Sequence, residues 1–236
     1  MNLIRAMAKR GHEVTVVCSD EDKRGKDGYV VMPTLSLGPL NNYVSKNGVS
    51  LSRANKRVLK PVIQNSDVVH VMMPFMLGTA AVKLCKKYDI PVTAGFHMQA
   101  ENFTSHVFMK DNPLANQITY HTIYRNVYRH VDAVHYPTEF IRNVFEQAVH
   151  HRTNGYVISN GVGERFKPIK IEKPAEFANR FVIIFSGRYS KEKCHSVLID
   201  AAALSKHSRD IQLIFAGEGA VKQQPRWGGG ERYVNA

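Results

Sequence analysis

A pair of cations stands directly after a short apolar run in the second half of the chain. Arg188 and Lys193 lie five residues apart, and the apolar run at 181–184 is typical of a short buried strand. An amphipathic pattern follows, so we expect both cations at the carboxyl end of a strand, beside a helix N-terminus. Two cations there, together with the helix dipole, form a site for a doubly charged phosphate group. A solvated loop with ordinary surface charges remains the alternative on spacing alone.

A histidine occupies a similar place in the first half. His97 comes directly after the apolar stretch 91–96, which we predict to be a strand. Ligands of open parallel sheets gather at the carboxyl ends of strands, so a titratable side chain there is well placed for chemistry. A satisfied core histidine is the alternative. Glu101, a few residues on, is a weaker acid–base candidate, because an exposed loop carboxylate is the default interpretation.

The elements that would position these residues alternate regularly. The patterns predict a helix at 2–10, strands at 13–18 and 30–32, and a helix at 51–64 that Pro61 ends or kinks. Strands at 67–71, 91–96, 133–136 and 155–159 then alternate with helices at 77–88, 113–130 and 138–150, the last capped by Thr138. This order favours an α/β fold with a mainly parallel sheet.

A change of composition divides the chain. Residues 164–179 are rich in Lys and Pro and lack apolar periodicity, so we interpret them as a linker between a domain at 1–163 and a second at 180–222. The second domain begins with a strand–helix–strand unit that ends at 211–216, in which Val197, Leu198, Ala201, Ala202 and Leu204 are predicted to be buried. Such a unit cannot cover both faces of its sheet, so the second domain is predicted to be incomplete. Residues 223–236, with three consecutive glycines, are predicted to form an irregular tail.

Composition narrows the classes of partner. The 236 residues carry a formal net charge of +12, which favours an anionic partner such as a phosphorylated small molecule or an acidic lipid surface. We expect no nucleic-acid partner, because no recognised nucleic-acid-binding pattern accompanies the charge. Cys18, Cys85 and Cys194 are widely spaced, as in a reduced cytoplasmic protein, and no metal-ligand spacing occurs. The longest apolar run, at 71–82, is too short to span a bilayer.

Several motifs in the same order resemble one enzyme family. The stretch SGRYSKEKCHSVLIDAAALSKHSRDIQLIFAGEG resembles the donor-binding segment of the retaining GT4-family glycosyltransferases (glycosyl transferases group 1). LIRAMAKRGHEVTVV, DVVHVMMPF, VDAVHYPTEFIRNVF and VISNGVGERFKP are similar to further segments of that family, and the likeness spans residue 2 to about 222. The pattern departs at Cys194, where the family usually has Gly. GFHMQAENFTSH also resembles, more narrowly, members that glucosylate diacylglycerol.

The resemblance implies a fold and a reaction. It implies a GT-B fold of two Rossmann-like domains and transfer of a sugar from a nucleotide-diphosphate donor, expected to be a UDP-sugar, to an acceptor with retention. By the resemblance, Arg188 and Lys193 bind the donor diphosphate and His97 faces the donor sugar as the catalytic residue. Gly187 is a further cleft candidate. Neither a metal nor a cofactor is expected, since two fixed cations take the metal's place.

Two departures from the family pattern leave an alternative function open. The family's first strand and the paired-Glu motif of the donor domain are expected before and after this sequence, so the chain resembles an internal fragment, and a truncated relative that only binds an anionic ligand is the alternative function. The dipeptide of Asn160 and Gly161 is explained by a turn with positive φ, or by a secondary cleft role that the resemblance implies.

A local cluster of basic residues completes the candidates. Arg53, Lys56, Arg57 and Lys60 fall on a predicted helix of the first domain. Lipid-directed members of the resembled family work at the cytoplasmic face of the membrane, so the cluster is a candidate for peripheral contact with an anionic membrane surface. A solvated helix face is the alternative.

Overall fold

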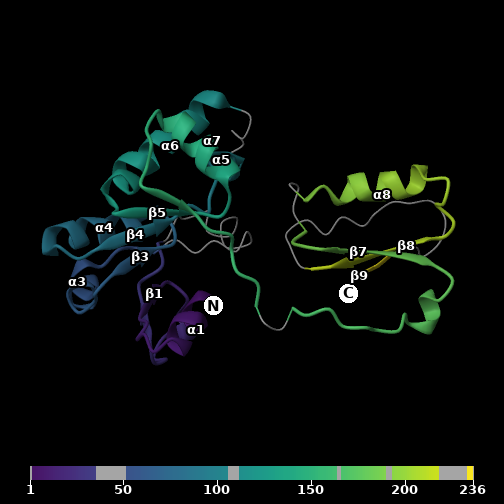
Figure 1. The fold of residues 1–236 in the computed structure, drawn as a ribbon, viewed down its shortest axis with the longest axis horizontal. Helices are drawn as coiled ribbons and strands as arrows, with labels where there is room; N and C mark the ends of the chain where they lie inside the picture. The colour runs from purple at the N-terminus through teal and green to yellow at the C-terminus, as the bar shows by residue number, and fades with distance from the viewer. Residues whose placement is uncertain are drawn as a thin grey trace. The chain divides into compact units, whose positions relative to one another are not determined.

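The chain folds into two compact units. The computed structural model describes residues 2–35, 52–105, 112–163, 166–189, 193–217 and 233–235. The first unit lies within residues 1–36 and 50–166, and the described part of the second runs from residue 167 onward (Figure 1). Among the described residues, every pair of neighbouring strands in both units is parallel. The prediction of an α/β fold with parallel sheets is confirmed.

The first unit contains two sheets. β1 (Val16–Cys18) pairs with β2 (Tyr29–Val31), and a four-stranded sheet has the order β3 (Val69–Val71), β4 (Val92–Gly95), β5 (Ala133–Tyr136) and β6 (Gly155–Val157). Each strand of the four-stranded sheet pairs with its sequence neighbour, and a helical connection precedes β4, β5 and β6 in turn. This is the arrangement that alternating strands and helices favour.

The helices of the first unit precede or connect these strands. They are α1 (Asn2–Lys9), α3 (Lys56–Gln64), α4 (Met76–Tyr88), α5 (Ala100–Ser105), α6 (Pro113–Asn126) and α7 (Glu139–Val149), with short 3-10 helices η1 (Glu21–Lys23) and η3 (Tyr128–His130). α3 packs against α4, and α6 packs against both α5 and α7 (Figure 1). Aromatic rings form the centre of this core: Phe96 is fully buried and its ring centroid lies 4.3 Å from that of Phe145.

Local signals set the ends of several helices. The Thr138 hydroxyl accepts a hydrogen bond from the N–H of Ile141 at 3.2 Å, so the predicted N-cap is confirmed. Asn55 caps α3 in the same way, which is why this helix begins at Lys56 and the predicted helical start upstream is wrong for residues 52–55. Pro61 lies inside α3, and the helix continues to Gln64 beyond it.

The second unit is built on a strand–helix–strand unit. β7 (Phe181–Ser186), α8 (His195–Leu204) and β8 (Ile211–Ala216) follow one another, after a 3-10 helix η4 (Ala175–Phe177) within the predicted linker. β9 (Tyr233–Asn235) pairs in parallel with β8. The prediction of an irregular tail is therefore wrong for these three residues, because pairing with a distant strand supplies an order that local periodicity does not show.

The buried face of α8 differs from the predicted one. The buried residues of this helix are His195, Ile199 and Ala202, whose spacing places them on one helical face. Val197 and Leu204, which were predicted to be buried, are 62% and 87% exposed, and Ala201, also predicted to be buried, is exposed as well. The predicted amphipathic pattern is wrong for α8, because apolar residues occur all around this helix; only the tertiary structure could decide which face meets the sheet.

Candidate functional site

The predicted phosphate-binding residues lie at the carboxyl end of β7. Arg188 follows Gly187 directly after this strand, and Lys193 lies two residues before α8; both cations are exposed. A Cβ placed on Gly187 would lie 3.8 Å from Cδ and Cε of Lys193. The methylene chain of Lys193 therefore runs across Gly187, so the structure brings this lysine to the end of the strand where an anion would be bound.

A second glycine, at position 217, allows close packing at the same end of the sheet. A Cβ on Gly217, at the end of β8, would overlap with the carbonyl oxygen of Gly187. The N–H of Gly187 in turn donates to the carbonyl of Ala216 at 3.0 Å. The two strand ends thus approach each other as only glycine at position 217 allows. Sequence reasoning missed this packing role, which a glycine directly after a predicted strand could have suggested.

Aromatic packing fixes the start of α8. The ring of His195 stacks on that of Tyr189 with centroids 4.8 Å apart and an interplanar angle of 7°, and lies 4.7 Å from the ring of Phe185. His195 and Tyr189 are both buried. These contacts tie the backbone after β7 to the first turn of α8, and Lys193 lies between them. Sequence reasoning missed these residues because they form no motif with a chemical signature.

The backbone conformation of Cys194 is the one that suits the glycine usual at this position in the resembled family. Cys194 adopts φ 50° and ψ 42°, in the left-handed region just before α8. Glycine is the residue that adopts this conformation without steric cost. The backbone shape at this position is thus one that glycine favours, and a cysteine occupies it here.

His97 lies in the loop after β4, as predicted, and is exposed rather than a core histidine. A Cβ on Gly95 would overlap with Nε2 of His97, so the imidazole folds back over this glycine. The His97 ring meets the ring of His135, with centroids 5.4 Å apart and an interplanar angle of 65°. Burial of the ring, and then the neighbouring His135, lower the pKa of His97 below its usual value. Its imidazole therefore favours the neutral form.

Two further histidines belong to the same surface. His70 on β3 shares a hydrogen bond of 2.8 Å between its Nδ1 and the Thr93 hydroxyl, and His135 lies on β5. Burial lowers the pKa of His70, with smaller contributions from His135 and His97. Sequence reasoning missed both residues. Their positions inside predicted strands could have suggested a shared face, but only the register shows that both lie on it and only the structure shows that His135 contacts His97.

The remaining site candidates are the dipeptide of Asn160 and Gly161 and the carboxylate of Glu101. Asn160 and Gly161 are exposed after β6, and a Cβ on Gly161 would meet nothing within 4 Å. Neither residue has a positive φ, so the predicted turn with positive φ is wrong. Glu101 belongs to the first turn of α5, and its carboxylate accepts a hydrogen bond of 2.7 Å from the buried Tyr120 hydroxyl. A structural contact thus engages this carboxylate.

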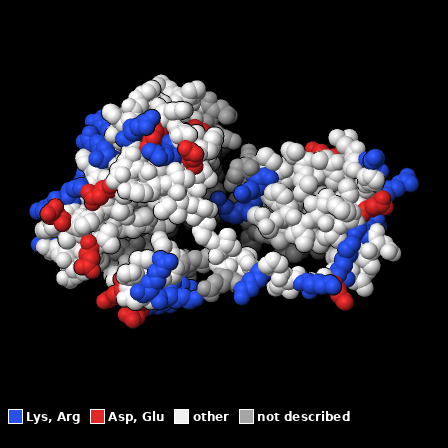
Figure 2. Space-filling view, viewed as in Figure 1, with Lys and Arg blue, Asp and Glu red and all other residues white. Residues whose placement is uncertain are grey.

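The predicted basic cluster lies on and beside α3, and all four of its residues, Arg53, Lys56, Arg57 and Lys60, are exposed. The adjacent α4 adds Lys83, Lys86 and Lys87, also exposed, which sequence reasoning did not associate with the cluster. Lys60 and Lys87 each place Nζ 5.6 Å from the ring centroid of Tyr88, which joins the two helices. On the face seen in Figure 2, Lys and Arg are spread over both units with acidic residues among them.

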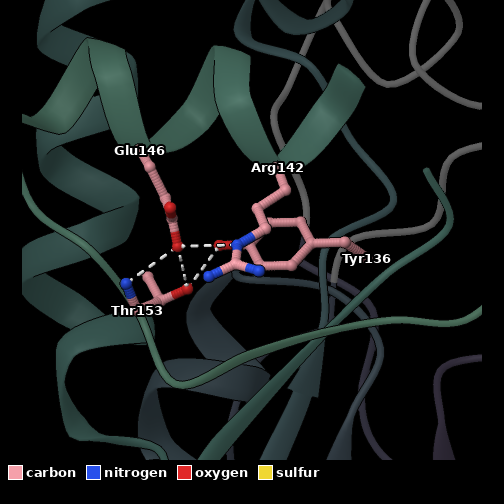
Figure 3. A network of polar contacts seen from close by, with 4 residues as sticks. All are labelled: Tyr136, Arg142, Glu146 and Thr153. Atoms are coloured by element: carbon pink, nitrogen blue, oxygen red, sulfur yellow. Dashed lines mark hydrogen bonds and ion pairs between the residues drawn. The ribbon is translucent and has the colours of Figure 1, made fainter. Parts of the chain in front are cut away.

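A network of polar contacts holds the segment that leads into β6. Glu146 on α7 accepts hydrogen bonds from the Thr153 N–H at 2.9 Å, the Thr153 hydroxyl at 2.8 Å and Nε of Arg142 at 3.2 Å (Figure 3). The hydroxyls of Thr153 and Tyr136 lie 3.0 Å apart. Burial raises the pKa of Glu146, but these hydrogen bonds and the Arg142 charge outweigh it and leave the pKa lowered. The network anchors the chain between α7 and β6.

The described residues include neither a group of metal ligands nor a helix that could span a membrane. Within these ranges, no three His, Cys, Asp or Glu side chains are grouped so that they could hold a metal ion. None of the described helices has the length and apolar character needed to cross a bilayer.

Comparison with solved structures supports the fold. HepE of Anabaena, solved in complex with UDP and glucose, aligns with a TM-score of 0.55 and 15% identity over 90% of this chain and 63% of its own. A Listeria monocytogenes protein assigned as a UDP-N-acetylglucosamine 2-epimerase aligns with a TM-score of 0.53 and 15% identity, over 98% of this chain and 63% of its own. The predicted GT-B type of α/β fold is confirmed.

Comparison of sequences identifies the family. A Bacillus subtilis (strain 168) protein assigned as a glycosyltransferase, EpsD, is 28% identical over 186 residues, which are 70% of this chain and 45% of the relative. The chain thus spans less than half the length of this relative. Residues 166–226 match Glycosyl transferases group 1, and residues 1–165 match Glycosyltransferase Family 4. The chain belongs to the GT4 glycosyltransferases.

Proposed function

We propose that this chain belongs to an enzyme that transfers a sugar from a nucleotide-diphosphate donor to an acceptor with retention of configuration. The observation that carries the proposal is the position of Lys193 across Gly187, next to Arg188 and the start of α8. Cations at such a strand end can neutralise the charge that develops on a departing diphosphate. Family membership and the UDP bound in HepE support a UDP-sugar as the donor.

The proposed roles divide between the two units. Arg188 and Lys193 bind the diphosphate, while His97 forms hydrogen bonds with the donor sugar. A neutral imidazole can donate one hydrogen bond and accept another, which suits contact with sugar hydroxyls. The lowered pKa of His97 supports the neutral form at neutral pH. The proposed mechanism needs no metal, because the two cations provide the positive charge.

Calorimetric titration of the chain with UDP and with UDP-glucose, at moderate salt, tests the proposal. Binding of both that weakens when either Arg188 or Lys193 is replaced supports it. Binding of UDP with no sugar transfer to any acceptor indicates a relative that binds an anionic ligand without turnover. No affinity for either compound overturns the donor assignment.

We propose further that the acceptor is a membrane lipid, reached from the cytoplasmic side. The support is the exposed basic surface formed by Arg53, Lys56, Arg57 and Lys60 together with the lysines of α4. In it, Lys60 and Lys87 both lie over the ring of Tyr88, while Lys86 pairs with Asp132 at 2.8 Å. Each Lys or Arg near an anionic bilayer contributes about 1 kcal/mol, so this set suffices for reversible contact. Co-sedimentation with vesicles, described below, tests it.

A further inference from the structure

Three histidines lie at one face of the four-stranded sheet: His70 and His135 on its strands and His97 in the loop after β4. In the parallel register, His70 lies opposite Thr93, and Gly95 lies opposite His135. Side chains alternate along a strand, so these four residues share one face, while their neighbours Val71, Ala94 and Val134 are buried on the other. The face formed by His70, Thr93, Gly95 and His135 is therefore polar where the opposite face is apolar.

His97 joins this face from the loop beyond β4. A Cβ on Gly95 would overlap with Nε2 of His97, and would lie within 3.3 Å of two further atoms of its ring. The imidazole thus occupies the space that any other residue at position 95 would fill with its own side chain. Gly95 has no positive φ, so space rather than backbone conformation requires a glycine here.

His135 is the second residue, after Gly95, that contacts the ring of His97. Its Nε2 lies 2.6 Å from the carbonyl oxygen of Ile158, which can only accept, so Nε2 carries a hydrogen and donates. The Ile158 N–H donates to the Tyr136 carbonyl at 2.9 Å, which keeps this acceptor in place. The His135 ring is thereby held at the edge of the His97 ring, with centroids 5.4 Å apart.

The polar network on the opposite face of β5 helps to hold His135 in position. Thr153, held by Glu146 and hydrogen-bonded to Tyr136, precedes β6 by two residues (Figure 3). It fixes the entry of β6, and Ile158 follows this strand directly. The orientation of His135 thus depends on packing at both ends of β6.

We propose that Gly95 and His135 are positioning residues, which hold the imidazole of His97 against the sheet in the orientation that meets the donor sugar. The role of His97 itself rests on the proposed function. The two residues act differently: Gly95 leaves the space, and His135 supplies the contact that limits rotation of the ring. Burial and His135 lower the pKa of His97, so displacement of the ring should raise it towards its usual 6.5.

Nuclear magnetic resonance of the chain labelled with ¹³C-histidine tests the proposal. The Cε1–H signal of His97 is the one that disappears in His97→Asn. In Gly95→Ala and in His135→Ala, this signal should shift and its titration midpoint should rise. The signals of His121 and His150, which lie 6.4 Å apart between α6 and α7, should stay unchanged as a control for folding. His135→Gln, whose amide can donate to the Ile158 carbonyl, should keep the wild-type signal better than His135→Ala.

Addition of ligand separates this proposal from the proposed function. UDP-glucose should shift the His97 signal of the wild type more than UDP does, and this difference should shrink in Gly95→Ala. No difference in the wild type contradicts contact of His97 with the sugar, while the variants still report on positioning. An unchanged His97 signal and midpoint in both Gly95→Ala and His135→Ala, with the fold retained, overturns the positioning roles.

Discussion

The imidazole of His97 lies in the space that a side chain on Gly95 would occupy. The glycine therefore decides the direction of a histidine two residues later, although its backbone needs no unusual conformation. A residue type that is often assigned to turns here permits a close approach on a strand. The relationship connects the sheet of the first unit to the residue proposed to face the donor sugar.

His97→Asn should lower sugar transfer without lowering stability. His97 is exposed, so its replacement leaves no cavity in the core. If the ring contacts the sugar in the transition state, loss of that contact should lower kcat, roughly tenfold to 100-fold, as for a misplaced or missing positioning group. Turnover of UDP-glucose and thermal melting measure the two effects. A lower melting temperature with a proportionate loss of activity would mark His97 as a structural residue.

Arg188→Ala and Lys193→Ala should each weaken the binding of UDP. Loss of one charge-assisted contact costs on the order of 1.5–3 kcal/mol, which corresponds to roughly tenfold to 150-fold in Kd. Isothermal calorimetry at moderate salt gives the change directly. Lys206→Ala removes an exposed lysine beyond α8 and is the matched control, expected to leave Kd unchanged. Equal UDP affinity in all three variants would remove the phosphate assignment.

Neutralising the basic surface should release the chain from anionic vesicles. A variant with Arg53, Lys56, Arg57 and Lys60 all changed to Gln loses contributions of about 1 kcal/mol each near an anionic surface. Co-sedimentation with and without anionic lipid, at low and high salt, measures the effect.

The control for this experiment removes the same number of charges from exposed positions of the second unit: Lys167, Lys170, Lys206 and Arg209. If both fourfold variants bind vesicles equally, net charge rather than this surface is responsible. If the wild type stays in the supernatant under every condition, the cluster is a solvated helix face and the lipid acceptor loses its support.

Glu146→Gln should destabilise the first unit. The side chain of Glu146 is only 12% exposed, and its carboxylate accepts three hydrogen bonds from Thr153 and Arg142. Replacing a charged acceptor by an amide should reduce the free energy of unfolding by about 1.5–3 kcal/mol. Urea denaturation measures it. Glu13→Gln, at an exposed position of the same unit, should change little, and an equal effect of both substitutions would show that the network adds nothing specific.

Stability should fall as the pH is lowered through the range in which His70 and His97 titrate. The pKa values of His70 and His97 lie below 6.5 in the folded chain, so the unfolded chain binds more protons there. Their contribution is complete above pH 6.5 and is lost as the pH falls through the folded values. Most carboxylates titrate near pH 4, below this window.

Melting temperatures measured between pH 7.5 and about pH 5 test this prediction, in the range where histidine titrates. In the double variant His70→Gln and His97→Gln, the slope should be smaller than in the wild type. Identical slopes in the two proteins would contradict a contribution of His70 and His97 to the pH dependence.

The amino-acid sequence by itself determined the local elements and the order in which they follow. The apolar runs of β5 and β8 predict those strands at their observed bounds, and Thr138 predicts the start of α7. These features depend on residues close in sequence, whose periodicity and capping chemistry are visible in the chain itself. The same holds for Lys193, since its place between a strand and a helix follows from the elements on either side.

Only the tertiary structure decided which distant residues meet. His70, His97 and His135 share a surface because the register of three strands aligns them, and a shift of one residue would turn His70 or His135 to the other face. The register depends on pairing between strands that are far apart in the sequence, which local patterns do not encode. For the same reason, the buried side of α8 and the pairing of β9 with β8 follow from packing between elements rather than from composition within them.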